Sequence, residues 1–349
     1  MIANVASDTV QSKLQLGYSG YPVSHIKFLR CRSDMGELQV GGAFSESPEF
    51  ITEGLLRCCS CGQEYPIIDG IVQMLEQREL DAEGIHELRF RDELNAVNPN
   101  FPNTPAVEYW NNLEMEPTLA ALNLQEEAVF LELACGTGRY TTKLIGRCRA
   151  LVAVDFSLVS LRALAERIPK GAKIGLVQAD ITMMAVAPRS FDRILSTTCL
   201  DSREQRMAMH HLAAEALTEE GLYVFGNEYY NLQTRLLGLP RVQRYTHGGM
   251  LYCHLEKDDV LRETAPFFRR VTARPIQVPI PFTRHLAYKW KKAIARIAER
   301  IPLICDLGAL LLVSAGTPIR QPVEGQHSSG NKLAMTIYRW YRNRQGKDS

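Results

Sequence analysis

Residues 129–140 read Val129-Phe130-Leu131-Glu132-Leu133-Ala134-Cys135-Gly136-Thr137-Gly138-Arg139-Tyr140, and this run is the most informative part of the chain. It begins with apolar residues typical of a buried strand, and Glu132 stands near the end of that strand. Gly136 and Gly138 then predict a tight turn into a helix, because glycine adopts backbone conformations that other residues avoid. Such a turn lets the backbone approach a cofactor closely while a carboxylate meets a polar group on it.

Glycine turns of this type also bind NAD or FAD, or serve structure alone. A dinucleotide oxidoreductase would have a third glycine where Thr141 stands, which weakens the nicotinamide interpretation. The segments that follow the turn provide further evidence on which cofactor it binds. Four more strand-like runs occur downstream, at residues 151–154, 174–177, 191–196 and 221–225.

Acidic residues end the first three strands of this series. Asp155 follows the second strand, where an acid is placed to accept hydrogen bonds from ribose hydroxyls. Asp180 follows the third strand, where we expect it to bind the exocyclic amine of an adenine, with Phe156 and Ile181 against the ring faces. Together with Glu132 on the first strand, these acids predict a nucleoside-binding site around one glycine turn.

The order of these parts resembles that of the class I S-adenosylmethionine-dependent methyltransferases. The matching segments are 131–139, 153–157, 178–181, 191–195 and 217–222. The resemblance implies an α/β fold, namely a doubly wound, seven-stranded Rossmann-like sheet, with S-adenosylmethionine as the cofactor. By position, it implies that the cofactor contacts Glu132, Ala134, Gly136, Gly138, Asp155, Phe156, Asp180, Ile181 and Thr197.

The same resemblance assigns roles to single residues. Glu132 would face the methionine ammonium group, Asp155 would hold the ribose, and Asp180 would hold the adenine amine. Ala134 stands where the family has its first loop glycine, so we expect a slightly different loop geometry there. A non-catalytic protein that keeps the fold and binds the cofactor is the alternative.

Composition limits the classes of function. The chain has 349 residues, a formal net charge of +1 and nine cysteines. The near-neutral charge argues against a surface built mainly to hold a long nucleic acid. The first residues lack the pattern of a signal peptide, and we find no apolar run long enough to cross a membrane. An odd number of partly clustered cysteines is typical of reduced thiols, so we expect a cytoplasmic protein without a transmembrane segment. The sequence leaves the oligomeric state open.

Four of the potential metal ligands occur in two short motifs, Cys31-x-x-Asp34 and Cys58-x-x-Cys61. Two such motifs on tight turns can present four ligands to a zinc ion, although aspartate is less usual than cysteine in structural sites. The segment 29–75 resembles the small zinc-ribbon family that activates tRNA and protein methyltransferases, through its residues 29–34 and 54–75. The resemblance implies a β-rich ribbon domain with a structural or docking role, with or without bound zinc.

The remaining chain shows helical segments, linkers and an insertion. A basic amphipathic segment at 284–300 predicts a helix that is a substrate lid, a solvated surface helix or an interfacial membrane contact. The expected organisation is a tail (1–25), the zinc-ribbon-like domain (26–78), a helical linker or lid (79–126), the methyltransferase domain (127–320, with an insertion at 228–255 and the lid helix at 284–300) and a C-terminal tail and helix (321–349).

Methyl transfer from a sulfonium is an in-line displacement that depends mainly on positioning, so catalytic side chains are few. Our candidates near the strand ends are His247, the preferred base, with Tyr229 and Asp201. The chain lacks the Asn/Asp-Pro-Pro-Tyr/Phe run of the adenine- and glutamine-methylating branches after its fourth strand. We therefore predict a small-molecule acceptor such as a metabolite, lipid or natural product, with an RNA (tRNA) methyltransferase that docks through its ribbon as the alternative.

Overall fold

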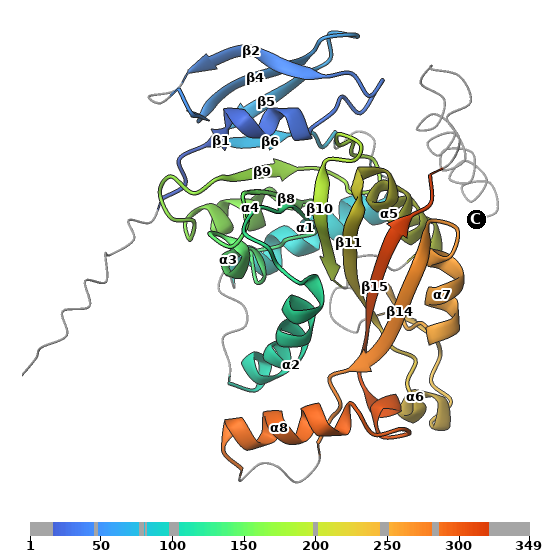
Figure 1. Cartoon of the computed structure of the whole chain (residues 1–349). Helices are drawn as coiled ribbons and strands as arrows, with labels where there is room; N and C mark the ends of the chain where they lie inside the picture. Colours follow the sequence, from blue (N-terminus) through green and yellow to red (C-terminus); the bar gives the residue numbers. More distant parts are fainter. Residues whose placement is uncertain are drawn as a thin grey trace, which may run out of the picture.

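The computed structural model describes residues 17–44, 48–76, 80, 82–97, 105–197, 202–244, 251–280 and 286–320, with backbone alone at 43–44, 95, 97, 105–107, 244 and 251–252. Among these residues, eleven strands form one twisted sheet (Figure 1). Seven of these strands are in the order β9-β8-β7-β10-β11-β15-β14, with β15 antiparallel to its two neighbours. This arrangement confirms the predicted α/β class and the Rossmann-like sheet. The seven strands are β7 (Val129–Leu133), β8 (Ala150–Asp155), β9 (Ile174–Gln178), β10 (Phe191–Thr197), β11 (Leu217–Glu228), β14 (Phe268–Ile276) and β15 (Leu310–Pro318).

The N-terminal β-rich region continues this sheet. Its strand β6 runs parallel to β9, with Ile71 opposite Leu176 and Val72 opposite Val177. Beyond β6 the strands are antiparallel, so the upper part of Figure 1 is a meander built on the edge of the larger sheet. The strands of this region are β2 (Leu38–Phe44), β4 (Glu53–Cys58), β5 (Glu64–Ile68) and β6 (Ile71–Gln73), with β1 (Tyr21–Pro22) paired to β3 (Phe50–Ile51) beside them.

The tail expected over residues 1–25 is wrong from residue 17 onward. Tyr21 is fully buried, and the Tyr18 hydroxyl donates to the carbonyl oxygen of Ile174 at 3.2 Å and accepts from the amide of Leu176 at 3.2 Å. A short 3-10 helix, η1 (Val23–Phe28), follows at once. Two tyrosines therefore anchor this segment on β9, and packed structure begins before the predicted boundary at residue 26.

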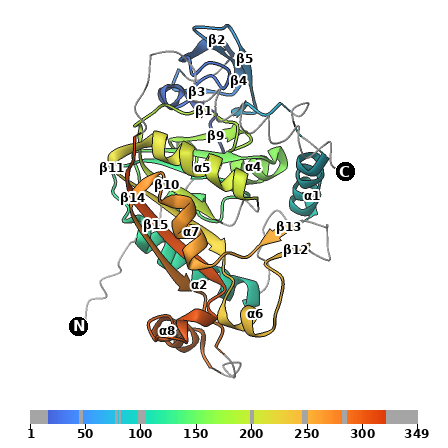
Figure 2. The same ribbon diagram turned by 90° about the vertical axis from the view of Figure 1, so that its right-hand side faces the viewer.

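Helices cover both faces of the sheet, as the doubly wound class requires. Successive strand residues alternate between the faces, so Leu131 packs with the α5 side and Phe130 with the α4 side. In Figure 2, α5 and α7 lie in front of the strands. The helices are α1 (Ala82–Val97), α2 (Pro105–Leu122), α3 (Thr141–Leu144), α4 (Leu158–Ala165), α5 (Arg203–Ala216), α6 (Leu232–Leu236), α7 (Lys257–Thr264) and α8 (Tyr288–Ala298), with the 3-10 turn η3 (Cys305–Leu307).

Two smaller features complete the described structure. A hairpin of β12 (Val242–Arg244) and β13 (Leu251–Cys253) belongs to the insertion predicted at 228–255. No helix in the described part of the chain is long and apolar enough to cross a bilayer.

Candidate functional site

The turn after β7 has the backbone shape that its glycines predict. Gly136 and Gly138 have φ angles of 55° and 88°, in the left-handed region that favours glycine. A side chain at Gly138 would also place its Cβ 2.3 Å from a methyl carbon of Leu164 on α4. Ala134 takes a φ of 57°, so this alanine adopts a conformation that is strained for any residue except glycine. The loop thus keeps a glycine-type geometry at a position where the sequence has none.

Glu132 lies in the middle of the sheet, next to this turn. Its side chain is 2% exposed, and its Oε2 accepts a hydrogen bond of 2.7 Å from the hydroxyl of Thr141. Burial raises the pKa of this carboxyl group to about 8, because a charge is poorly solvated there. A cation that reaches Glu132 would therefore stabilise its ionised form.

Asp155 connects the ends of two strands. One carboxylate oxygen accepts a 2.6 Å hydrogen bond from the amide of Gly136, and the other accepts from the amide of Ser157 at 2.9 Å. Burial raises the pKa of Asp155 as well. The acid predicted to hold a ribose therefore also fixes the shape of the glycine loop. Ser157 caps α4 by accepting from the amide of Ser160, and its hydroxyl donates to Asp92 on α1.

The remaining cofactor candidates occupy neighbouring positions. Asp180 follows β9, and its Oδ1 accepts from the amide of Thr182 at 2.8 Å and from the hydroxyl of the same residue at 2.6 Å. Ile181 is buried and Phe156 is half-buried after β8. Thr197 ends β10, opposite Gly226 of β11 in the sheet register. The parallel strands therefore place these side chains along one edge of the sheet.

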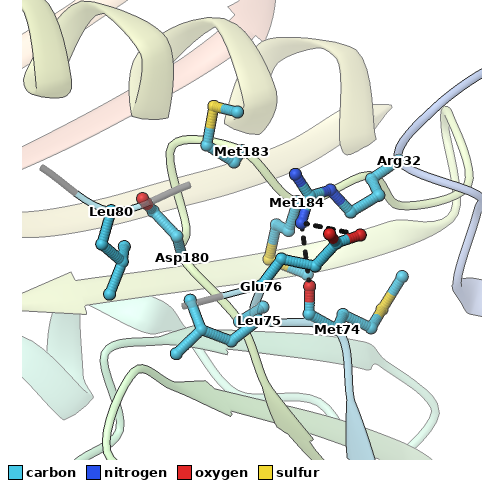
Figure 3. Close-up of a pocket in the computed structure, with 9 residues that line it drawn as sticks. Arg32, Met74, Leu75, Glu76, Leu80, Asp180, Met183 and Met184 are labelled. Carbon is cyan, nitrogen blue, oxygen red and sulfur yellow. Dashed lines mark hydrogen bonds and ion pairs between the residues drawn. The ribbon is translucent and has the colours of Figure 1, made fainter. Parts of the chain in front are cut away.

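A pocket lies next to Asp180, at the junction with the β-rich region (Figure 3). It is a small hollow that is partly open to solvent. Arg32 forms one wall, and its guanidinium donates to the carbonyl oxygen of Met74 at 3.3 Å and pairs with Glu76 at 3.9 Å. Leu75 and Met183 also line the pocket (Figure 3). Sequence reasoning missed this pocket, because its walls come from segments more than a hundred residues apart.

Helix α2 is attached to the glycine loop by a buried ion pair. Glu114 on α2 is almost fully buried and forms two hydrogen bonds with Arg139, at 2.6 and 2.8 Å, and a third with the hydroxyl of Tyr140 at 3.0 Å. The Asn111 side-chain oxygen accepts from the same arginine at 2.7 Å. The sequence indicated Arg139 only as the residue after the loop, and it gave no reason to connect it with α2.

Two polar groups at the start of α2 are buried without a hydrogen-bond partner among the described residues: the Tyr109 hydroxyl and the Asn111 side-chain nitrogen. The Tyr109 ring lies 6.2 Å from Trp110 and 5.8 Å from Tyr288 of α8, between ring centroids. Burial raises the pKa of Tyr109, so its hydroxyl remains a donor at neutral pH. Buried polar groups without partners are rare, which makes this position a candidate contact for a bound molecule.

The register of the sheet shows where this part of α2 lies. Leu310 of β15 pairs with Glu228 of β11 on one side and with Ile276 of β14 on the other. Gln277, the next residue after β14, donates from its side chain to the carbonyl oxygen of Trp110 at 2.9 Å. The first half of α2 therefore lies at the carboxyl end of β11, the edge at which open α/β sheets bind their ligands.

The catalytic candidates are only partly placed by the structure. Tyr229 is buried after β11, and its hydroxyl donates to Asp306 at 3.1 Å. Burial and this hydrogen bond raise the pKa of Tyr229 to about 12, so the phenol is a donor and not a base near neutral pH. His247 and Asp201 lie outside the described residues.

The cysteine motifs meet at one end of the β-rich region. The ligand atoms of Cys31, Asp34, Cys58 and Cys61 all lie within 4.8 Å of one another. Cys31 Sγ is 3.6 Å from Cys61 Sγ, and Cys58 Sγ is 3.3 Å from Asp34 Oδ1. Ligands of a tetrahedral zinc ion with bonds of about 2.0–2.3 Å lie about 3.3–3.8 Å apart, so this donor set fits zinc.

Groups around the cysteines also suit a metal site. The amide of Ser60 points at Cys58 Sγ from 3.3 Å, and the Tyr65 hydroxyl lies 3.2 Å from Cys31 Sγ. Hydrogen bonds of this kind orient thiolate ligands and moderate their charge. All four ligands would come from the protein, so a zinc ion here would stabilise the fold and leave no open position for chemistry.

Comparison with known proteins identifies the central segment. Residues 130–221 match the family model described as a methyltransferase domain. This match covers β7 to the start of β11, including the glycine loop, Asp155 and Asp180. No curated protein matches the chain.

The solved structures that resemble this chain are distant from it in sequence. The N-methyltransferase NodS from Bradyrhizobium japonicum is 16% identical, over 68% of this chain and 100% of that one, with a TM-score of 0.45. The phosphoethanolamine N-methyltransferase 1 of Haemonchus contortus is 12% identical, over 78% and 57%, with a TM-score of 0.48. An S-adenosylmethionine-dependent methyltransferase from Mesorhizobium loti is 18% identical, over 58% and 97%, with a TM-score of 0.42.

At these identities and TM-scores, the solved structures do not indicate which acceptor this chain methylates. The family match and the strand order carry the assignment of the class, and the glycine loop lies within the matched residues. Residues 130–221 form a methyltransferase domain, and the chain is an S-adenosylmethionine-dependent methyltransferase.

Proposed function

We propose that the enzyme transfers the methyl group of S-adenosylmethionine to a small molecule that binds between α2 and the carboxyl end of β11. The observation that carries this proposal is the pair of buried, unpartnered polar groups of Tyr109 and Asn111. Asn111 also contacts Arg139, which follows the glycine loop, so the side chain of Asn111 lies beside the cofactor position. The Tyr109 ring lies on the side of α2 that faces Tyr288. The two polar groups would orient the acceptor, and the nucleophile would be an oxygen, nitrogen or carbon atom.

The proposed cofactor contacts follow the edge of the sheet. Glu132 would pair with the ammonium group of the methionine part, and Asp155 would accept from the ribose. Asp180 would accept from the adenine amine beside the pocket that Arg32 and Leu75 line. The buried state of Glu132 supports its assignment, because an ammonium ion would compensate a charge that the protein alone solvates poorly.

The attachment of α8 supports a small acceptor. Lys292 of α8 pairs with Glu116 of α2 at 2.9 Å, and Arg296 donates to the carbonyl oxygen of Leu113 at 2.9 Å. Tyr288 of α8 packs against Tyr109. A helix held in this way beside the acceptor position restricts access by a polynucleotide, and it favours a molecule that enters between the two helices.

Replacing Tyr109 by phenylalanine tests the acceptor site. We expect KM for the acceptor to rise about 2- to 13-fold, which corresponds to the loss of one hydrogen bond. The melting temperature should not fall, because the hydroxyl has no partner among the described residues. The assay measures S-adenosylhomocysteine released with a panel of small amines, phenols and carboxylic acids, and with bulk tRNA as a macromolecular arm.

The matched control is Tyr18→Phe, which removes a hydroxyl with two backbone partners far from the site. It should lower the melting temperature and leave KM unchanged. Turnover with tRNA and with none of the small acceptors would contradict the proposal, as would a Tyr109→Phe enzyme with an unaltered KM for the acceptor that is turned over.

The affinity for S-adenosylmethionine should depend on pH through Glu132. With a carboxyl pKa of about 8 in the free protein, binding of the ammonium group below pH 8 must release a proton. The dissociation constant should therefore fall by up to about tenfold per pH unit as the pH is raised from 6 to 8. Calorimetry in buffers of different ionisation heat measures both the constant and the released proton. Glu132→Gln should bind more weakly and without this slope, and a wild-type enzyme with no slope would refute the assigned contact.

A further inference from the structure

Helix α8 turns its apolar side toward solvent. Trp290 is 58% exposed and Ile297 is 59% exposed, and Ile294 and Ile301 are exposed as well. The four residues follow a spacing of four, three and four, which places them in one line along the helix and the turn after it. We call these four residues the α8 stripe. An exposed apolar line of this length is unusual on a soluble surface and marks an interaction site.

The opposite side of α8 attaches it to the protein with small and charged residues. Ala295 and Ala298 are buried, and the Glu299 side chain is only 2% exposed. Glu299 accepts from Arg296 at 2.8 Å and from the amide of Gln277 at 3.0 Å. The helix therefore docks through polar contacts, small residues and the ring of Tyr288, whereas the usual surface helix turns its large aliphatic side chains inward. The apolar stripe plays no part in holding the helix.

The surface next to the stripe is also apolar. Leu303, in the turn after α8, is 74% exposed, and Leu236 on α6 is 78% exposed. Helix α6 contacts η3, which directly follows that turn. Both views show α6 and α8 at the same end of the molecule, away from the β-rich region (Figures 1 and 2). The exposed apolar side chains thus gather at one end.

Positive charges border the stripe. With 3.6 residues per turn, Lys289 and Arg300 lie on one side of it and Lys291 on the other. Lys289 and Arg300 are exposed, and the segment 286–298 contains no acidic residue. An apolar line with cationic borders matches the boundary between lipid headgroups and acyl chains, and lysine and arginine there are attracted to anionic lipids.

We propose that α8 is an interfacial helix that docks the enzyme on an anionic lipid bilayer. The stripe would enter the boundary between headgroups and acyl chains, with the helix parallel to the membrane plane. A second copy of the chain fits less well, because a two-fold contact through the stripe would bring the cationic borders of both copies together. RNA would pair with the cations and stack a base on Trp290, but it would leave the line of isoleucines without a partner.

Flotation of the full chain with vesicles tests the proposal. The protein should float with vesicles of phosphatidylcholine and phosphatidylglycerol in a 3:1 ratio, and at least about tenfold less with phosphatidylcholine alone. Ile297→Glu should abolish flotation, and the double variant Lys289→Glu, Lys291→Glu should remove the preference for the anionic lipid. The matched control is Ile68→Glu, an exposed isoleucine of β5 at the other end of the molecule, which should float like the wild type.

Circular dichroism and S-adenosylmethionine binding distinguish a loss of membrane binding from a loss of the fold. Unchanged circular dichroism and S-adenosylmethionine binding of Ile297→Glu would show that the variant is folded, so its loss of flotation would support the proposal. Equal binding of both vesicle types, or retained flotation of Ile297→Glu, would overturn it. The absence of wild-type flotation would also overturn the proposal. In that case, a concentration-dependent dimer in ultracentrifugation that Ile297→Glu dissociates would identify the stripe as a contact between two copies of the chain.

Discussion

Asp155→Ala is expected to weaken the binding of S-adenosylmethionine by about 1–3 kcal/mol, which is roughly a 5- to 150-fold rise in the dissociation constant. Two effects act in the same direction. The variant loses the carboxylate assigned to the ribose hydroxyls, and it also loses the 2.6 Å hydrogen bond that fixes the amide of Gly136. Without this bond the glycine loop has more conformations in the free protein, and binding must order it. Calorimetric titration of the cofactor measures the change.

Asp192→Ala is the matched control for this prediction. Asp192 lies near the amino ends of the parallel strands, away from the proposed cofactor position. Its carboxylate accepts from the amide of Val129 at 2.9 Å and from the hydroxyl of Thr218 at 3.2 Å. Its removal should lower the melting temperature by breaking two structural hydrogen bonds and leave cofactor affinity unchanged. The assigned role of Asp155 would be refuted by a folded Asp155→Ala protein that binds the cofactor as tightly as the wild type does.

Removal of metal is expected to have the largest effect on stability. Zinc in small structural sites contributes on the order of 10 kcal/mol of binding free energy, which is available to the fold because the site forms only in the folded chain. We expect about one zinc ion per chain in protein prepared without chelator, and a lower melting temperature after its extraction. Elemental analysis and calorimetric melting with and without a chelator measure both.

The neighbouring cysteines provide the control for the metal prediction. Cys58→Ser should lose the metal, because Cys58 Sγ belongs to the cluster of ligand atoms. Cys59→Ser should retain it, because this exposed thiol lies outside that cluster. Asp34→Cys should bind zinc more tightly, since thiolates are the more usual ligands of structural zinc. A metal-free wild type with a melting temperature insensitive to chelators would contradict the site.

The central sheet was predictable because its signals are local. Each strand of the first half is a short apolar run, and an acid or a glycine turn marks where it ends, as at Glu132 and Asp155. The pairing of β6 with β9 was not predictable. The three residues 71–73 carry no information about which of several apolar strands they join, a hundred residues away. The same reason hid the anchoring of Tyr18 and Tyr21.

The proposed cofactor contacts could be named from the sequence, whereas the contacts of α2 beside the proposed acceptor position could not. Glu132, Asp155 and Asp180 belong to motifs of contiguous residues, whereas the Glu114–Arg139 pair and the unpartnered hydroxyl of Tyr109 depend on how α2 packs. Amphipathicity likewise indicated that α8 has an apolar side. Only the structure shows that this side faces outward, because the periodicity of a helix does not say which face meets the protein.

The parallel pairing of β6 with β9 has a consequence for how the molecule behaves at low concentration. The outer edge of β9 would otherwise present unpaired amide and carbonyl groups, which other chains can recruit for aggregation. A covering strand from a separate polypeptide would leave this edge on dilution. Here the cover belongs to the same chain, so its local concentration is set by the connecting residues and not by the amount of protein in solution. The edge therefore stays paired in a single isolated molecule.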